Sequence, residues 1–273
     1  TIRMWEQRYN ALRPIRSQGN TRYYDDSQLR RLLNIVSLLE SNFKISQLGP
    51  MKDEELFSLS KKLQENTSAA PEEYFISQLI SAGMEYDEPA FDKLFSHCLL
   101  RYGLKITYTK VLYPLLLRLG LLWSTNVLPP ANEHFISNIL RQKLFTSIDS
   151  LPACNQSEPG WLLFLPENEF HEIGLLFANY LLRSSGKKTI YLGSNVPLSS
   201  VLNAVSDSKF ENLLFFLTHH DNPENVQDYL DKLKKEARGK NIYLAANKNL
   251  LNEIKTGKNI LKLPDIEALE NQL

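Results

Sequence analysis

The amino-acid sequence predicts a multidomain α and α/β protein in three parts, at residues 1–67, 70–150 and 158–273. Helical periodicity, without a convincing two-residue alternation, extends from Glu72 to about Ser150. After Pro159, short apolar runs alternate with helical segments instead. The Ser-Ala-Ala-Pro stretch before Glu72 has the composition of a linker. A chain of 273 residues is long enough for two or three such domains.

The first part (1–67) is predicted to be helical around one long loop. Ile2, Trp5 and Tyr9 are spaced to share one face of a first helix, over residues 1–9. Pro14 and Gly19 then interrupt helical structure. Further helices are predicted near residues 27–40, 44–48 and 53–63.

The second part (70–150) is predicted to be a four-helix bundle. Its apolar residues recur at helical spacing in four segments with short connections between them, which is typical of antiparallel neighbours. The segments lie near residues 72–83, 87–101, 104–121 and 129–149.

The third part (158–273) is predicted to be a doubly wound domain with a five-stranded parallel sheet of the flavodoxin-like type. Ligands of such sheets bind beyond the carboxyl ends of the strands, here the loops at 166–171, 218–221 and 246–248. The predicted strands are 161–165, 189–192, 212–217, 242–245 and 260–263, and the helices are near 172–185, 198–207, 223–237, 247–256 and 265–272.

Charge and cysteine content narrow the class of protein. Basic and acidic residues number 31 each, but the first 31 residues hold seven arginines and three acidic residues, a local net charge of +4. The only cysteines are Cys98 and Cys154, which argues against a disulfide scaffold. No apolar run approaches the roughly 20 residues that span a bilayer, so we expect a cytoplasmic protein without membrane contact.

The first 40 residues contain the pattern I-R-x-W-E-x-R-Y, followed by Pro14 and the run Gly19-Asn20-Thr21-Arg22-Tyr23-Tyr24. This text resembles the DNA-binding region of the MerR family of transcription regulators. The resemblance implies a winged helix that binds double-stranded DNA. We expect this sequence to lack the initial helix and turn with which the family's winged helix begins. Arginines can neutralise phosphates, and tyrosine hydroxyls can contact them. The expected DNA-contacting residues are Arg3, Arg8, Tyr9, Arg16, Arg22 and Tyr23, whereas Trp5 is expected in the core.

The sheet domain contains Glu169-Phe170-His171-Glu172-Ile173-Gly174 directly after its first predicted strand. This segment resembles the D/E-x-H-x-x-G signature of cobalamin-binding modules. Imidazole is a good ligand for cobalt, so the resemblance makes His171 the lower axial ligand. Glu169 can hold the other ring nitrogen, and Gly174 lets the backbone approach the nucleotide tail of the cofactor.

The bundle contains Trp123 followed by Glu133-His134, a W-x9-E-H spacing. It resembles the cap domain of light-sensing cobalamin repressors of the CarH and LitR type. The resemblance implies that these three residues cover the upper face of cobalamin, with adenosylcobalamin as the expected form. It also implies a homodimer or homotetramer that changes its operator binding and has no enzymatic activity. Taken separately, a bundle Trp is usually core and a Glu-His pair is usually helix surface.

The sequence departs from this family in three places. Thr218 is followed by His219 and His220, where the family has a Ser/Thr-rich stretch. Ala245-Ala246 stands where the family has Gly-Gly beside the nucleotide tail. Ser124 replaces the histidine that follows the cap Trp in the light sensors and can bind cobalt after photolysis, and a hydroxyl is a poor substitute for imidazole.

Three alternative functions remain open from the sequence. A degenerate sensor would keep the fold, lose cobalamin and respond to a partner protein, which the bulky His219-His220 and Ala245-Ala246 favour. A corrinoid carrier of an enzyme system would need a catalytic domain for which the chain has no room. A phosphoreceiver would need an Asp where Thr218-His219 ends the third strand.

Overall fold

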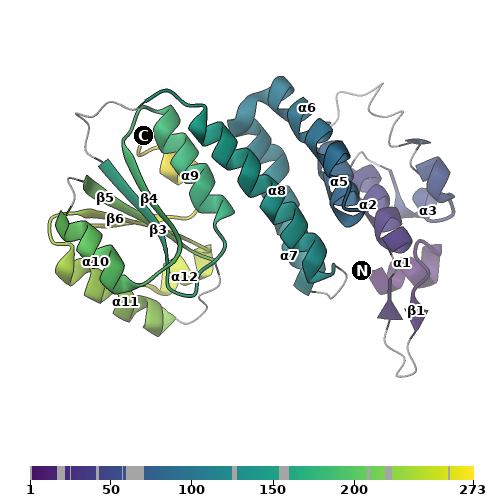
Figure 1. Ribbon diagram of the computed structural model, residues 1–273. Coiled ribbons are helices and arrows are strands. Elements are labelled where there is room, and N and C mark those ends of the chain that lie inside the picture. The colour runs from purple at the N-terminus through teal and green to yellow at the C-terminus, as the bar shows by residue number, and fades with distance from the viewer. Residues whose placement is uncertain are drawn as a thin grey trace. The chain divides into compact units, whose positions relative to one another are not determined.

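The computed structural model describes residues 2–16, 22–24, 26–40, 43–56, 58–59, 71–124, 128–153, 160–207, 210–218, 223–257 and 259–273. The chain forms two compact units, Thr1–Ile136 and Ser137–Leu273. Figure 1 shows the helices of the first unit and the sheet of the second. None of the described helices is long and apolar enough to cross a membrane.

The first unit begins with three helices and a small antiparallel sheet. Strands β1 (Ile15–Arg16) and β2 (Arg22–Tyr23) pair in the register Ile15↔Tyr23, on either side of the predicted loop. The sequence shows no alternation here because each strand has only two residues. The helices are α1 (Ile2–Tyr9), α2 (Asp26–Glu40) and α3 (Ile45–Leu48), and residues 53–56 and 58–59 are also helical.

A small apolar core holds these elements together. Trp5 and Tyr9 are partly buried against a cluster of fully buried aliphatic side chains, so the predicted core position of Trp5 is confirmed. The cluster joins α2, α3, the helical residues 53–56 and the connection after α1, and consists of Ala11, Ile35, Leu38, Leu48 and Leu56.

The helices expected in the bundle are present, with one break where Gly103 lies. Gly103 has φ 72° and ψ 165°, a left-handed conformation that interrupts α6 between the two predicted helices at 87–101 and 104–121. A π-helical segment, η1 (Tyr108–Leu112), then leads into the next helix, and no local sequence signal announces it. The helices are α5 (Pro71–Met84), α6 (Glu88–Thr107), α7 (Tyr113–Ser124) and α8 (Pro130–Asp149).

The second unit contains the predicted five-stranded parallel sheet, with strand order β4-β3-β5-β6-β7. The strands are β3 (Gly160–Pro166), β4 (Thr189–Val196), β5 (Phe210–Leu217), β6 (Asn241–Ala246) and β7 (Ile260–Leu263). The order reverses at β3, which lies between β4 and β5, so the carboxyl ends of β3 and β5 form the switch point of the sheet.

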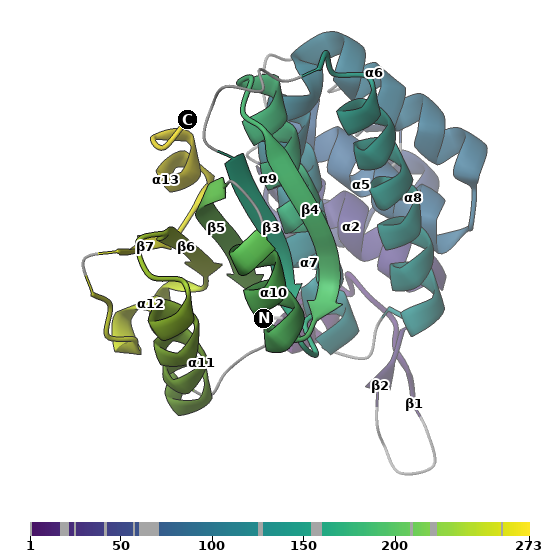
Figure 2. The ribbon, with the colours of Figure 1, turned by 60° about the vertical axis from the view of Figure 1, so that its left-hand side comes forward.

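Helices alternate with the strands and cover the sheet. Helices α10 (Leu198–Asp207), α11 (Pro223–Glu236) and α12 (Lys248–Glu253) contribute apolar side chains to one core that also contains Leu162, Phe164 and Phe215. Helix α9 (Ile173–Ser184) packs on the opposite face, as Figure 2 shows, and α13 (Ile266–Glu270) follows β7. Helices thus cover both faces of the sheet whose edge contains the switch point.

Candidate cobalamin and DNA sites

The loop between β3 and α9 positions His171 through a buried carboxylate. Glu169 is fully buried, and its Oε1 lies 2.6 Å from Nδ1 of His171. A carboxylate can only accept here, so Nδ1 carries the proton and Nε2 is the ring nitrogen able to coordinate a metal. The side chain of His171 is 49% exposed. The contact that the E-x-H spacing predicts is therefore present, with the ring oriented for one coordination bond.

The same carboxylate joins the two loops at the switch point. Oε2 of Glu169 accepts a hydrogen bond of 2.7 Å from the backbone N–H of Thr218, directly after β5. Oε1 also accepts from the backbone N–H groups of Phe170, at 3.0 Å, and His171, at 3.1 Å. These backbone donors compensate for burial of the charge. Thr218 thus lies beside the His171 loop, while His219 and His220 lie outside the described residues.

Two asparagines with left-handed backbone conformations connect the end of β4 to the histidine loop. Asn168 has φ 66° and Asn195 has φ 55°, values that asparagine tolerates better than most residues. The backbone N–H of Asn168 donates to Oδ1 of Asn195 at 2.9 Å, and the N–H of Asn195 donates to the carbonyl of Glu169 at 3.0 Å. The end of β4 is thereby tied to the histidine loop. Sequence reasoning missed this pair, since nothing local links residues 27 positions apart.

Glu172 connects the histidine loop to α8 and β4, and sequence reasoning missed it too. Its Oε1 accepts a hydrogen bond of 2.8 Å from the Tyr191 hydroxyl, and its Oε2 lies 3.6 Å from Nη1 of Arg141 on α8. Burial, together with the hydrogen bond to Glu172, raises the pKa of Tyr191 far above its usual value. The Phe145 ring packs edge-on against Tyr191, with centroids 6.4 Å apart. Helix α8 is therefore fixed to the residue that follows His171.

The remaining predicted tail-binding residues lie on nearby elements. Gly174 is half-buried in the first turn of α9. Ala246, the last residue of β6, pairs with Leu217 and packs against the core under α10–α12. Ala245 precedes it, so its methyl group points to the other face of the sheet. The two methyl groups therefore point to opposite faces of the sheet.

The bundle residues lie in the first unit. Trp123, in the last turn of α7, is 49% exposed. Glu133 and His134 are in the first turn of α8, with Nδ1 of His134 3.5 Å from Oε2 of Glu133, and the His134 side chain is 74% exposed. The side chain of Ser124 lies outside the described residues. The simple expectation of a buried core Trp does not hold, because half of the indole faces outward.

A buried amide side chain fixes the start of α8. Asn132 is 5% exposed and donates from Nδ2 to the carbonyls of Gly83, at 3.3 Å, and Met84, at 3.0 Å. It thus satisfies the last carbonyls of α5, which have no partner within their own helix. A Cβ on Gly83 would overlap the side chain of Ile136. These residues hold the start of α8, and therefore Glu133-His134, against α5.

Three of the four predicted DNA-contacting arginines are exposed. Arg3, Arg8 and Arg16 are exposed. Nε of Arg22 instead donates at 3.0 Å to the largely buried Glu6, which also accepts from the Tyr24 hydroxyl. The remaining predicted contacts are Tyr9, which is partly buried against the core, and Tyr23 in β2, whose side chain lies outside the described residues.

Arg31 is one of the seven arginines in the first 31 residues, but its role is structural. Its guanidinium donates to the carbonyl of Ala11 at 2.6 Å, the carbonyl of Gly49 at 2.7 Å and the carboxylate of Asp53 at 2.5 Å. Only 10% of the side chain is exposed. Part of the +4 charge is therefore used inside the fold and is not available to phosphate.

Family models match segments in the first two of the three predicted parts. Residues 1–54 match the family model described as MerR HTH family regulatory protein, and residues 75–146 match the model described as B12 binding domain. This chain joins a MerR-type DNA-binding region to a B12-binding module. The second match covers the helices α5–α8, from which Trp123, Glu133 and His134 come.

Two curated relatives of this MerR-type, B12-binding chain are repressors. It is 27% identical over 237 residues to the HTH-type transcriptional repressor CarH of Myxococcus xanthus, covering 85% of this chain and 79% of that protein. It is 26% identical over 213 residues to the HTH-type transcriptional repressor CarA of the same organism, covering 75% of this chain and 66% of that protein. Among solved structures, the monomethylamine corrinoid protein of Methanosarcina barkeri has a TM-score of 0.56 at 16% identity, covering 73% of this chain and 97% of that one. This last likeness concerns the fold alone.

The one imidazole ligand that His171 offers fits a metal ion that is already coordinated by a macrocycle. Among the residues that the structure describes, no three His, Cys, Asp or Glu side chains gather as a metal site would require. A metal held by protein side chains alone usually needs three or four ligands. In bound cobalamin the corrin ring would supply most of the cobalt ligands, so one imidazole from the protein would be enough to hold it. The single oriented imidazole of His171, supported by Glu169, meets that requirement.

Proposed function

We propose that this DNA-binding transcriptional regulator senses cobalamin by binding its cobalt through His171. The observation that carries the proposal is the buried Glu169 carboxylate, which holds Nδ1 of His171 and the backbone of Thr218 at the switch point of the sheet. The carboxylate fixes the ring tautomer and makes Nε2 a better donor to cobalt. Bound cobalamin supplies a cobalt centre whose upper ligand can change.

The upper side of the cofactor is assigned to the bundle residues. The half-exposed indole of Trp123 offers a flat apolar surface to the corrin and its upper ligand. Glu133 and His134 add polar contacts from the first turn of α8. These residues favour adenosylcobalamin, whose adenosyl group has both a flat ring and hydrogen-bonding edges. Release of this group by light would remove the contacts and give the light response that the resemblance implies.

The output is assigned to DNA through the MerR-type region. The exposed Arg3, Arg8 and Arg16 bind phosphates of the operator and set its register. Cobalamin must bind one state of the protein better than another to change DNA affinity. We assign this difference to assembly into a homodimer or homotetramer. We assign repression as the output because both curated relatives are named transcriptional repressors.

Absorbance spectroscopy tests the cofactor assignment. The full chain is mixed with adenosylcobalamin in the dark and desalted, and the bound corrinoid is read from its visible spectrum. We expect retained colour and loss of the histidine-ligated spectrum in His171→Ala. The matched control is His97→Ala, since His97 is an exposed histidine of α6. Colourless wild-type protein would overturn the proposal in favour of a degenerate sensor.

A DNA experiment separates a regulator from a corrinoid carrier. Operator binding is measured by gel shift with and without the cofactor, in the dark and after illumination. A regulator changes its DNA affinity with the cofactor state, and a carrier does not. Size-exclusion chromatography under the same four conditions reports whether the assembly changes in parallel.

A further inference from the structure

A second basic cluster lies in the sheet domain, at the end of α11 and the turn that follows. The ten residues from Asp231 to Lys240 include five lysines and arginines and only two acidic residues. The turn brings the chain back into β6 through Gly239, which has φ 81°. This end of the sheet is opposite to the carboxyl ends of the strands, where Glu169 and Thr218 lie. The cluster is therefore separate from the proposed cobalamin site.

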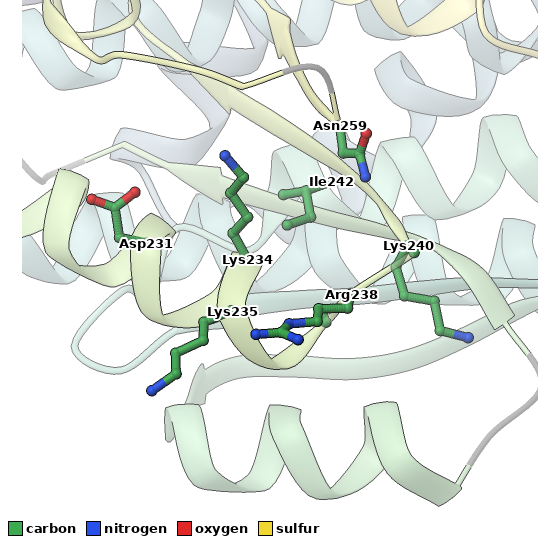
Figure 3. A pocket seen from close by; sticks show the side chains of 9 residues that line it. Asp231, Lys234, Lys235, Arg238, Lys240, Ile242 and Asn259 are labelled. Atoms are coloured by element: carbon green, nitrogen blue, oxygen red, sulfur yellow. The ribbon is translucent and has the colours of Figure 1, made fainter.

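The cluster lines a cavity of about 360 Å³. Figure 3 shows its lining: cations from the last turn of α11 and the following turn, and Asn259 from the segment before β7. Asp231 of α11 also lines the cavity, and its Oδ1 accepts a hydrogen bond from the amide of Gln227. The ammonium of Lys234 lies close to Gly257 in that segment. Ile242 of β6 provides an apolar wall. The cavity thus combines positive charge with an amide donor over a buried strand.

Three of the cations have no partner among the described residues. Lys234, Lys235 and Arg238 form no hydrogen bond or ion pair within that part of the chain. Lys240 differs, because its Nζ donates to the carbonyl of Phe210 and lies 5.2 Å from the centroid of that ring. Lys240 therefore fastens the turn to β5, and three positive charges remain to attract an anion.

The helix dipole accounts for only part of the cluster. Cations in the last turn of a helix are favoured by its partial negative charge, which explains Lys234 and Lys235 without a ligand. It does not explain Arg238, which lies beyond the helix, nor the amide of Asn259. A guanidinium with ammonium groups around a concave surface is the donor arrangement that phosphate oxygens prefer.

We propose that this cavity binds a small anion that carries a phosphate group. Arg238 would take two phosphate oxygens with its planar fork, and Lys234 and Lys235 would neutralise the charge. The volume is at the lower end of the range for small-molecule sites. A concave cavity of this size suits a free phosphate or phosphate ester better than the convex backbone of a duplex. The site adds a second ligand to the sensor domain.

Calorimetry with inorganic phosphate tests the proposal. The full chain is titrated with phosphate at constant ionic strength, with and without bound cobalamin, because the cofactor carries a phosphodiester of its own. The pocket variant is Lys234→Gln with Arg238→Gln. The control variant is Lys232→Gln with Lys93→Gln, two exposed lysines outside the cavity, with the same change in charge. All four positions are exposed, so the variants should keep the fold.

We expect the pocket variant to lose at least about tenfold in phosphate affinity, from removal of one bidentate charged contact. The control variant should stay within about twofold. Equal losses in both variants would show general charge attraction and overturn the proposal, as would wild-type protein that releases no heat with phosphate. In a third measurement, the same proteins are titrated with duplex DNA that lacks the operator. A pocket variant that loses affinity for this DNA, but not for phosphate, would reassign the cavity to the DNA backbone.

Discussion

The carboxylate of Glu169 accepts a 2.7 Å hydrogen bond from the backbone N–H of Thr218, 49 residues further along the chain. This bond ties the loop after β3 to the loop after β5, and the same carboxylate orients His171. Removing the charge should therefore affect both the ligand histidine and the stability of the switch point.

Glu169→Gln should weaken cobalamin binding about 10- to 100-fold, because an amide cannot accept all of these hydrogen bonds and orient the ring equally well. It should also lower the free energy of unfolding of the apoprotein by about 1–3 kcal/mol, from unsatisfied buried donors. Absorbance titration and urea denaturation measure the two effects. Glu167→Gln, an exposed change in the same loop, is the control. Unchanged affinity in Glu169→Gln would contradict a role in orienting His171.

Tyr191→Phe should lower the free energy of unfolding by about 1–2 kcal/mol, since the buried Glu172 loses a hydrogen-bond donor. Combined with Arg141→Gln in a double-mutant cycle, it should show coupling of about 0.5 kcal/mol or more, because both side chains act on one carboxylate. Additive effects of the two substitutions would mean that Glu172 does not link α8 to β4.

Arg31 and Arg8 should behave differently although both are N-terminal arginines. Arg31→Gln should cost about 2–3 kcal/mol of stability, because the side chain bonds two carbonyls and a carboxylate. The exposed Arg8→Gln should stay within about 0.5 kcal/mol. Arg8→Gln should instead reduce the salt dependence of operator binding by about one charge. Equal stabilities of the two variants would contradict the structural role of Arg31.

Cys98 should be unreactive in the folded protein. Burial raises the pKa of its thiol to about 12, so little thiolate exists near neutral pH. In a Cys154→Ser variant, reaction with a thiol reagent at pH 8 should be at least about 100-fold slower than in the urea-unfolded chain. Because the folded pKa is the higher one, this thiol favours the folded state below about pH 8.5, and that contribution is lost as pH rises toward 12. Rapid labelling of the folded variant would refute this burial.

Ser124 should limit the photochemistry of the bound cofactor. After illumination of the adenosylcobalamin complex, position 124 should not provide a second nitrogen ligand to cobalt, because a hydroxyl is a poor ligand for it. Ser124→His should introduce the spectrum of a two-histidine complex, which the additional change His171→Ala should remove. A two-histidine spectrum in the wild type that disappears in Ser124→Ala would contradict this prediction.

Periodicity was sufficient to predict the strands and helices of the sheet domain, because its parallel strands are buried apolar runs. The boundary predicted between the helices at 87–101 and 104–121 likewise coincides with the break at Gly103 within α6. The two-residue strands β1 and β2 and the π-helical segment were not predictable, since tertiary contacts determine such short features.

The sequence likewise predicted some contacts of the candidate site and not others. The spacing of Glu169 and His171 predicts their side-chain contact, because both residues lie in one short loop. The hydrogen bond from Thr218 uses a backbone N–H, which nearly every residue has. The sequence alone therefore does not identify Thr218 as the donor. Arg31 and Arg8 have the same charge, and only the fold distinguishes an internal guanidinium from an exposed one. Sequence patterns therefore indicate which groups can act, and packing decides which are available.

Helix α8 carries Glu133 and His134 in its first turn and Arg141, the partner of Glu172, two turns later. His134 and Arg141 are seven residues apart and so fall on nearly the same face of the helix. One residue inserted between them would rotate Arg141 by about 100° relative to His134, at 3.6 residues per turn. Single-residue insertions or deletions in this segment would therefore change the angle between the two side chains about the helix axis, whereas an insertion of seven residues would nearly preserve it.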